Sequence, residues 1–218
     1  MESFLIWTRR SFLERSSLAM AGAAGVALIP PHLFAEELLK TPTDAEGPFY
    51  PDELPLDTDN DLIIINENLD QAVGEVTHLH GKITDTKGNP IKNAKIEIWQ
   101  VDNNSRYIHT RDQAERKRDG NFQGFGRFVT GMDGTYYFRT IKPPAYPGRA
   151  PHIHFKVYVK NKCVLTSQFY VKGAAANKTD GLLKRIKDPK QRALAILDFK
   201  PIPDSKIGEL SAIGNVVI

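Results

Sequence analysis

The sequence contains almost no cysteine. Its 218 residues include only one, Cys163, so an intramolecular disulfide is excluded and nothing covalent cross-links the fold. A metal site built from several thiolates is excluded for the same reason. Cys163 lies near the start of an apolar run, and we expect it to be a buried or half-buried thiol.

Long apolar runs are missing too. The stretch over about residues 18–29 is rich in Ala and Gly and is too short to cross a membrane as a helix. It follows Thr8-Arg9-Arg10-Ser11-Phe12-Leu13, and an arginine pair before such a stretch resembles a twin-arginine export signal. We therefore expect residues 1–35 to be a bacterial signal peptide. An N-terminal amphipathic helix that belongs to the fold is the alternative.

A protein with this signal would be exported by the twin-arginine machinery, to the periplasm or the extracellular space. That route carries proteins that are already folded, often with a cofactor in place. Residues 33–35, just before Glu36, fit a cleavage point. His32 lies within the signal and is therefore not considered a metal ligand.

The chain has no strong net charge, but its charges are unevenly distributed. The formal charge is +3, and the basic residues are not clustered with aromatic ones, so a nucleic-acid partner is not indicated. Residues 36–75 carry twelve Asp or Glu and one Lys, whereas residues 76–218 carry twenty-five Lys or Arg and twelve Asp or Glu. The simplest interpretation is an acidic N-terminal arm, residues 36–75, that wraps a basic body, its own or a neighbour's. Attraction of a small anionic substrate by the body is the alternative.

Helical patterns are scarce after residue 75. Asp188-Pro189 predicts a short helix over residues 190–197, and residues 179–186 predict another. Met132-Asp133-Gly134 predicts a hairpin turn. The rest reads as short strands between turns, which predicts an all-β domain over residues 76–218, an antiparallel β-sandwich with few short helices. The predicted strands are residues 76–84, 94–101, 126–130, 135–140, 152–159 and 164–171.

One short segment concentrates groups that can bind a metal. It reads Tyr146-Pro147-Gly148-Arg149-Ala150-Pro151-His152-Ile153-His154. On a strand, residues two apart point to the same face, so the two imidazoles would lie side by side. Tyrosinate is a hard anionic donor that suits Fe(III), whereas zinc usually takes Cys, His or carboxylate ligands and copper electron-transfer sites need a thiolate. Tyrosines in β-proteins commonly only pack, so these residues alone leave several metals open.

The remaining histidines are weaker ligand candidates. His78 and His80 also lie two apart on a predicted strand, but no tyrosine or arginine is close to them in sequence. We interpret them as surface imidazoles or satisfied core imidazoles. His109 follows Tyr107 by two residues and could support a site from behind.

A series of motifs runs through the sequence. They are Gly47-Pro48-Phe49-Tyr50, Gly81-Lys82-Ile83-Thr84-Asp85, Gly88-Asn89-Pro90-Ile91, Ala94-Lys95-Ile96-Glu97-Ile98-Trp99-Gln100, Arg106-Tyr107, Gly124-Phe125-Gly126-Arg127, residues 133–143, Tyr146, Arg149, His152-Ile153-His154-Phe155 and Ser167-Gln168-Phe169-Tyr170. Together they resemble the intradiol ring-cleavage dioxygenases, and most closely the protocatechuate 3,4-dioxygenase type. The resemblance spans about residues 41–172 and lacks the long helical N-terminal linker of the catechol 1,2-dioxygenases.

The resemblance implies a metal site and an activity. A non-haem Fe(III) would be held by Tyr107, Tyr146, His152 and His154, with Tyr146 as the axial ligand that leaves when substrate binds and supplies a base. The substrates would be a catechol-type molecule and O2, and the ring would open between its two hydroxyl-bearing carbons to a muconate-type diacid. Arg149 would act with Tyr146 as a catalytic residue by stabilising negative charge on the ring.

The pocket and the assembly follow less directly. By position, Gln168 and Tyr50 would contact the substrate. Only Pro147-Gly148 separate Tyr146 from Arg149, and this short loop indicates an open site, which argues against protocatechuate and a two-chain assembly. A homo-oligomer is compatible with the sequence. A non-enzymatic β-sandwich binding module with a vestigial metal site is the main alternative function, and a zinc enzyme that uses His-x-His is another.

Overall fold

The structure is a computed structural model that describes residues 37–65, 70–112 and 115–218. The export signal expected over residues 1–35 lies outside the described residues. Within the described ranges, no helix is both long enough and apolar enough to cross a membrane.

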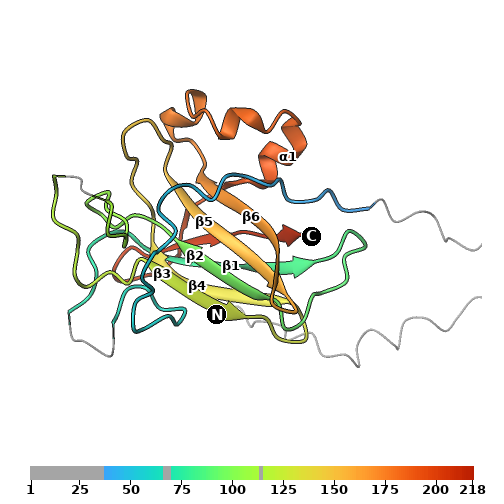
Figure 1. Cartoon of the computed structure of the whole chain (residues 1–218), viewed down its shortest axis with the longest axis horizontal. Coiled ribbons are helices and arrows are strands. Elements are labelled where there is room, and N and C mark those ends of the chain that lie inside the picture. The colour runs from blue at the N-terminus through green and yellow to red at the C-terminus, as the bar shows by residue number, and fades with distance from the viewer. Residues whose placement is uncertain (1–36, 66–69, 113–114) are drawn as a thin grey trace, which may run out of the picture. The chain divides into compact units, whose positions relative to one another are not determined.

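Two five-stranded sheets form the body (Figure 1). In the first sheet β1 is central, with β4 paired along one side and β9 and β10 along the other. Its strands are β1 (Val76–Thr84), β4 (Thr135–Ile141), β8 (Lys200–Pro201), β9 (Leu210–Ile213) and β10 (Val216–Val217). The second sheet runs in the order β3 (Phe125–Val129), β2 (Lys95–Trp99), β5 (His152–Val159), β6 (Lys162–Val171) and β7 (Ile196–Leu197).

The prediction of an all-β sandwich with few short helices is confirmed, but both sheets are mixed. The pairs β1–β9, β1–β10 and β6–β7 are parallel. Parallel pairing needs a crossover of about a dozen residues or more, and residues 172–195 supply one between β6 and β7. That crossover holds the three described helices, η1 (Ala175–Lys178), η2 (Leu183–Arg185) and α1 (Pro189–Leu194).

The predicted helices differ in length and type from those observed. Asp188 caps α1 as expected, because its Oδ1 accepts a hydrogen bond from Lys190 N at 2.8 Å and Pro189 follows it. The helix ends at Leu194 rather than at residue 197, since residues 196–197 pair with β6. The second helix, predicted over residues 179–186, is reduced to the single 3₁₀ turn η2, and η1 lies just before that range.

The hairpin predicted at Met132-Asp133-Gly134 is wrong. β3 pairs with β2, whereas β4 pairs with β1 in the other sheet, so this turn carries the chain between the two layers. Gly134 has φ +71°, and a Cβ there would lie 2.6 Å from Ile83 O. A glycine is therefore needed here because the turn passes close to the backbone of β1. The local sequence does not distinguish this contact from an ordinary hairpin turn.

β5, the central strand of the second sheet, is covered on both faces. Alternation along β5 sends Ile153, Phe155 and Val157 into the core between the sheets. His152, His154 and Lys156 point to the outer face, yet none is more than 9% exposed. A second layer must therefore cover this outer face.

The N-terminal segment, residues 37–56, supplies part of that cover. Asp44 N donates to Thr166 O on β6 at 2.9 Å, and Glu46 pairs with Lys156 at 2.8 Å. Further along the acidic arm, Leu62 and Ile63 are fully buried in the core. The arm therefore wraps its own body, and residues 36–218 form one compact unit.

Cys163 is exposed, contrary to expectation. It lies near the tip of the β5–β6 hairpin, where Lys162 and Val164 on either side are exposed too. The buried part of β6 begins only at Leu165, because the apolar run enters the sandwich there.

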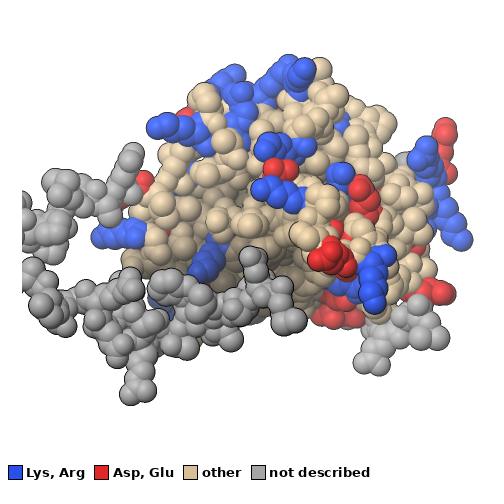
Figure 2. Space-filling view, turned by 180° about the vertical axis from the view of Figure 1, so that it is seen from behind, with Lys and Arg blue, Asp and Glu red and all other residues tan. Residues whose placement is uncertain are grey.

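Basic side chains gather over the crossover between β6 and β7. Figure 2 shows Lys and Arg over the top of the molecule, where Figure 1 places α1. Between this crossover and the N-terminal segment lies a hollow of about 750 Å³, lined in part by Lys40, Asp44, Arg185 and Lys187.

Candidate metal centre

Three of the four predicted ligands converge on one point at the outer face of the second sheet. His152 and His154 project from β5, and Tyr107 reaches them from the loop that follows β2. Tyr107 Oη lies 3.0 Å from His154 Nε2 and 3.3 Å from His152 Nε2, and the two Nε2 atoms are 3.0 Å apart. All three side chains are at most 3% exposed.

Tyr146, the fourth predicted ligand, stands beside this group. It lies in the loop between β4 and β5, with its ring centroid 5.7 Å from that of Tyr107 and 5.5 Å from that of His152. Tyr146 is only partly buried. It is therefore the most accessible of the four, as a ligand displaced by an incoming molecule would need to be.

The two imidazoles are neutral and offer nitrogen lone pairs. His152 Nδ1 lies 2.6 Å from Ala150 O, which can only accept a hydrogen bond, so the proton sits on Nδ1. Nε2 then carries the lone pair that could bind a metal. Burial, reinforced by the nearby Arg149, lowers the pKa of His152 to about 4. Burial also lowers the pKa of His154 well below its usual value, with further contributions from His152 and Arg149.

The phenol of Tyr107 needs a cation to ionise. Burial raises its pKa well above 10, and Tyr146 raises it further. A bound metal ion would oppose both effects, because it stabilises the phenolate. Two imidazole nitrogens and two phenol oxygens therefore fit a hard cation such as Fe(III).

Zinc fits these surroundings less well. Within the described residues, no three His, Cys, Asp or Glu side chains come close enough to hold a metal ion. A metal bound here by more than the two imidazoles would draw its further protein ligands from the tyrosine oxygens.

Aromatic rings hold the ligands in place. The Trp99 ring stacks on that of His154, with centroids 4.8 Å apart and planes at 8°. Phe49 stacks on Tyr107 with centroids 5.1 Å apart. His109 meets Phe49 edge-on at 5.7 Å and accepts a hydrogen bond from Arg111 N, so it supports the site from behind without joining it.

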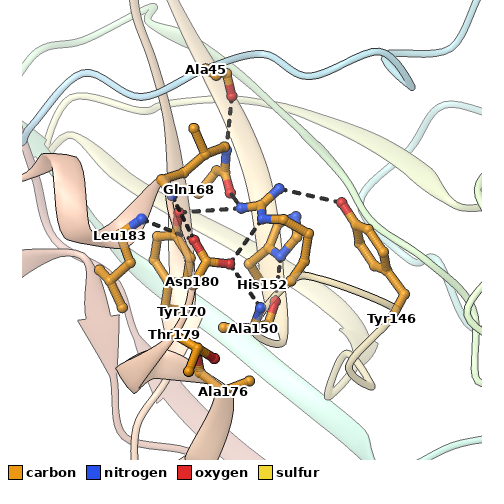
Figure 3. A network of polar contacts seen from close by, with 12 residues as sticks. Ala45, Tyr146, Ala150, His152, Gln168, Tyr170, Ala176, Thr179, Asp180 and Leu183 are labelled. Carbon is orange, nitrogen blue, oxygen red and sulfur yellow. Dashed lines mark hydrogen bonds and ion pairs between the residues drawn. The ribbon is translucent and has the colours of Figure 1, made fainter.

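Arg149 lies at the rim of the site, within a network of polar contacts (Figure 3). Its Nη1 donates to Tyr146 Oη at 3.3 Å, and its Nη2 donates to Gln168 Oε1 at 2.5 Å. Gln168 stands opposite His154 in the β5–β6 register and donates its Nε2 hydrogen to Ala45 O at 2.8 Å. The structure therefore brings Arg149 and Gln168 to the predicted ligands.

Tyr50 lies farther from the ligands. Its hydroxyl donates to Glu97 Oε2 at 2.9 Å, and its ring meets Trp99 edge-on at 5.0 Å. Lys156 Nζ lies 3.8 Å from the centroid of the same ring. These contacts anchor Tyr50 within the layer, and its contact with substrate stays a prediction.

His78 and His80 belong to the opposite sheet. His78 lies 2.6 Å from Tyr137 Oη and 3.1 Å from Glu209 Oε1, and His80 Nε2 lies 3.0 Å from Ser211 Oγ. Both imidazoles thus have polar partners at the outer face of the first sheet, as expected of satisfied surface residues.

Three further residues complete the network, and two of them, Asp44 and Asp180, carried no signal in the sequence. Tyr170 accepts from Arg149 Nη2 at 3.3 Å and donates to Asp44 Oδ2 at 2.8 Å. Asp180 accepts from Arg149 Nε at 2.8 Å. Asp44 and Asp180 are distant from Arg149 in the chain, so only the fold brings them together.

Gly47 permits the N-terminal segment to lie against His154. Its φ is +78°, and a Cβ there would be 3.3 Å from His154 Cε1. We expect Gly47→Ala to cost about 1–3 kcal/mol of unfolding free energy through backbone strain and to weaken metal binding, because the added methyl pushes on the imidazole. Thermal unfolding and bound-metal content would measure the two effects.

A second glycine provides the control for this prediction. Gly208 has φ +75°, but its Cβ would meet nothing within 4 Å. Gly208→Ala should cost similar strain and leave metal content unchanged. Equal metal content in the two variants would show that the Gly47 contact is unimportant.

Comparisons with known proteins identify chains that are similar to this one. The family model described as "Dioxygenase" matches residues 45–201. The protocatechuate 3,4-dioxygenase beta chain of Burkholderia cepacia is 37% identical over 122 residues, 53% of this chain and 52% of that protein. Catechol 1,2-dioxygenase 1 of Acinetobacter lwoffii is 30% identical over 151 residues, 61% of this chain and 47% of that protein. The chain thus spans about half the length of these two relatives.

A solved structure shows the same fold. The intradiol ring-cleavage dioxygenase of Tetranychus urticae superposes with a TM-score of 0.63, covers 83% of this chain and 94% of its own, and is 23% identical. At this identity the likeness establishes the fold alone.

Proposed function

Because this chain belongs to the dioxygenase family, we propose that it is a non-haem Fe(III) enzyme that cleaves a catechol-type ring between its two hydroxyl-bearing carbons. O2 is the second substrate and a muconate-type diacid the product. The observation that carries this proposal is the convergence of two neutral imidazoles and two phenols beside Arg149. A binding module with a vestigial site would have no need to keep these buried donors together.

Four residues would form the metal site. Tyr107, Tyr146, His152 and His154 would hold the iron. Bound there, Fe(III) would supply Lewis-acid chemistry that makes a catechol ring reactive toward O2. Tyr146, the most accessible of the four, would give up its place and take a catechol proton on Oη.

Arg149 and the N-terminal segment would complete the site. The Arg149 guanidinium would stabilise negative charge that develops on the ring. Gln168 would orient this guanidinium through the 2.5 Å hydrogen bond between Arg149 Nη2 and Gln168 Oε1. Gln168 also holds the segment at Ala45. That segment, with Gly47 against His154, would exclude water from one side of the metal.

The substrate proposal stays at the level of a catechol. Arg149 N donates to Tyr146 O at 3.0 Å, so the Pro147-Gly148 link is a tight turn, and both of its residues are exposed. A loop this short and exposed supports an open site.

Iron loading and oxygen uptake would test the proposal. We expect the iron-loaded protein to be wine-red from tyrosinate-to-Fe(III) charge transfer and to consume O2 with at least one member of a series of substituted catechols. A colourless preparation that contains stoichiometric iron would exclude the tyrosinate ligands. A coloured preparation that is inert to every catechol would contradict the activity.

We also propose export by the twin-arginine route and leave self-association as a homo-oligomer open to measurement. The motif around Arg9 and Arg10 supports export. Changing both arginines to lysine should retain the protein in the cytoplasm of a bacterial host, as judged by cell fractionation, and unaltered export would contradict the proposal. Light scattering on the purified protein would give the oligomeric state.

A further inference from the structure

Asp180 is a buried carboxylate in the crossover that joins β6 to β7, and it lies between η1 and η2. It is 1% exposed and lies outside the set of proposed ligands and substrate contacts. Its Oδ2 accepts from Arg149 Nε and from Ala150 N, each at 2.8 Å. Its Oδ1 accepts from Leu182 N at 2.9 Å and Leu183 N at 3.0 Å. Figure 3 shows Asp180 with its contacts to Leu183 and Ala150.

The charge state of Asp180 follows from these contacts. Burial opposes ionisation, but hydrogen bonds from Leu183 N, Ala150 N and Arg149 outweigh it and lower the pKa of the carboxyl group. The ion pair is therefore intact at neutral pH. A buried carboxylate that loses its only cationic partner would be left uncompensated, so the two side chains depend on each other.

Asp180 also determines which edge of Arg149 faces the site. The Nε edge is occupied by the carboxylate, so Nη1 and Nη2 turn toward Tyr146 and Gln168. The same Oδ2 atom holds the backbone of the next residue, Ala150. Arg149 is thus fixed both at its guanidinium and at its main chain, and few rotamers remain open to it.

We propose that Asp180 is a positioning residue that acts through Arg149 in the reaction proposed above. The inference rests on that proposed function. It extends the site to the crossover between β6 and β7, more than thirty residues beyond Tyr146 in the chain. Asp180 would not touch substrate or metal. Its contribution would be the preorganisation of a positive charge at the place where negative charge develops.

Asp180→Asn separates this role from a purely structural one. The amide oxygen of Asn can still accept from Leu182 N and Leu183 N, so the turn is preserved. The amide nitrogen then faces Arg149 Nε and Ala150 N. All three groups are hydrogen-bond donors, so the two hydrogen bonds that Oδ2 accepts are lost. We expect kcat to fall about 10- to 100-fold, with KM changed less than about threefold because ground-state binding is retained.

A second variant and a double variant complete the kinetic test. Asp188→Asn alters the aspartate that caps α1 in the same crossover, and we expect it to keep wild-type kcat within about twofold. In an Arg149→Leu background, Asp180→Asn should lower kcat no further, because its effect passes through Arg149. An unchanged kcat in Asp180→Asn, or an equal loss in both backgrounds, would overturn the inference.

Unfolding of the metal-free protein gives a readout independent of turnover. Each single variant, Asp180→Asn and Arg149→Leu, should lower the thermal midpoint, and the double variant should fall by less than the sum of the two shifts. Additive shifts would show that the side chains are not coupled and would overturn the inference. The wild-type enzyme could turn over no catechol while the shifts were non-additive. The proposed reaction and the role of Asp180 in it would then be excluded, but the coupling between Asp180 and Arg149 would be retained.

Discussion

Tyr107→Phe should bleach or shift the colour of the iron-loaded protein and abolish catechol-dependent oxygen uptake. The change removes only the oxygen that lies 3.0 Å from His154 Nε2 and 3.3 Å from His152 Nε2. Because Phe keeps the ring that stacks on Phe49, packing should survive. We expect the affinity for iron to fall by more than about 100-fold, since even residues behind a ligand are worth about 10- to 100-fold.

Tyr137→Phe is the matched control for this prediction. Tyr137 also presents a phenol next to an imidazole, His78, but on the opposite sheet. This variant should keep the colour, the bound iron and the oxygen uptake of the wild type. Oxygen uptake and colour that both survive Tyr107→Phe would exclude Tyr107 as a ligand.

Arg149→Gln should lower kcat by about 100- to 1000-fold while the protein keeps its iron and its colour. The charge is lost from a site where it would stabilise the transition state, and losses of this size follow removal of one such donor. Arg149→Lys should recover only part of the rate, because an ammonium lacks the planar fork that spans Asp180, Tyr146 and Gln168. Single-turnover kinetics with a catechol would measure both variants.

Stability limits how this second experiment is performed. Removing Arg149 leaves Asp180 buried without its cation, which costs about 3–5 kcal/mol in comparable pairs. Rates should therefore be compared well below the unfolding temperature of the variant. Arg139→Gln breaks another Arg–Asp pair, with Asp61 at 3.1 Å in the first sheet, and should leave kcat unchanged. If Arg149→Gln behaved like Arg139→Gln, the electrostatic role would be ruled out.

Much of the fold could be predicted because it depends on local patterns. Alternation along residues 152–159 predicted both a strand and the pairing of two imidazoles on one face. The cap at Asp188 was visible for the same reason. The turn at Met132-Asp133-Gly134 misled, since its local signal is the same whether it joins strands of one sheet or crosses between two.

The resemblance to a family carried the prediction of the site further than spacing could. Tyr107 stands forty-five residues before His152, and no periodicity relates them. The motif match alone selected it, and the structure places it beside both imidazoles. The same match offered Tyr50 as a substrate contact, which stays a prediction; in the fold its hydroxyl donates to Glu97.

The sequence by itself determined the pieces that lie within a few residues of one another: the His152/His154 pair, and Tyr146 and Arg149 just before it. Backbone geometry over a strand and a tight turn fixes such groups without help from the rest of the chain. The tertiary structure decided what surrounds them. Tyr107, the N-terminal segment and Asp180 arrive from three distant parts of the chain, because sheet pairing and burial of the core place them there. Those contacts depend on loop closure and packing, which no local pattern encodes.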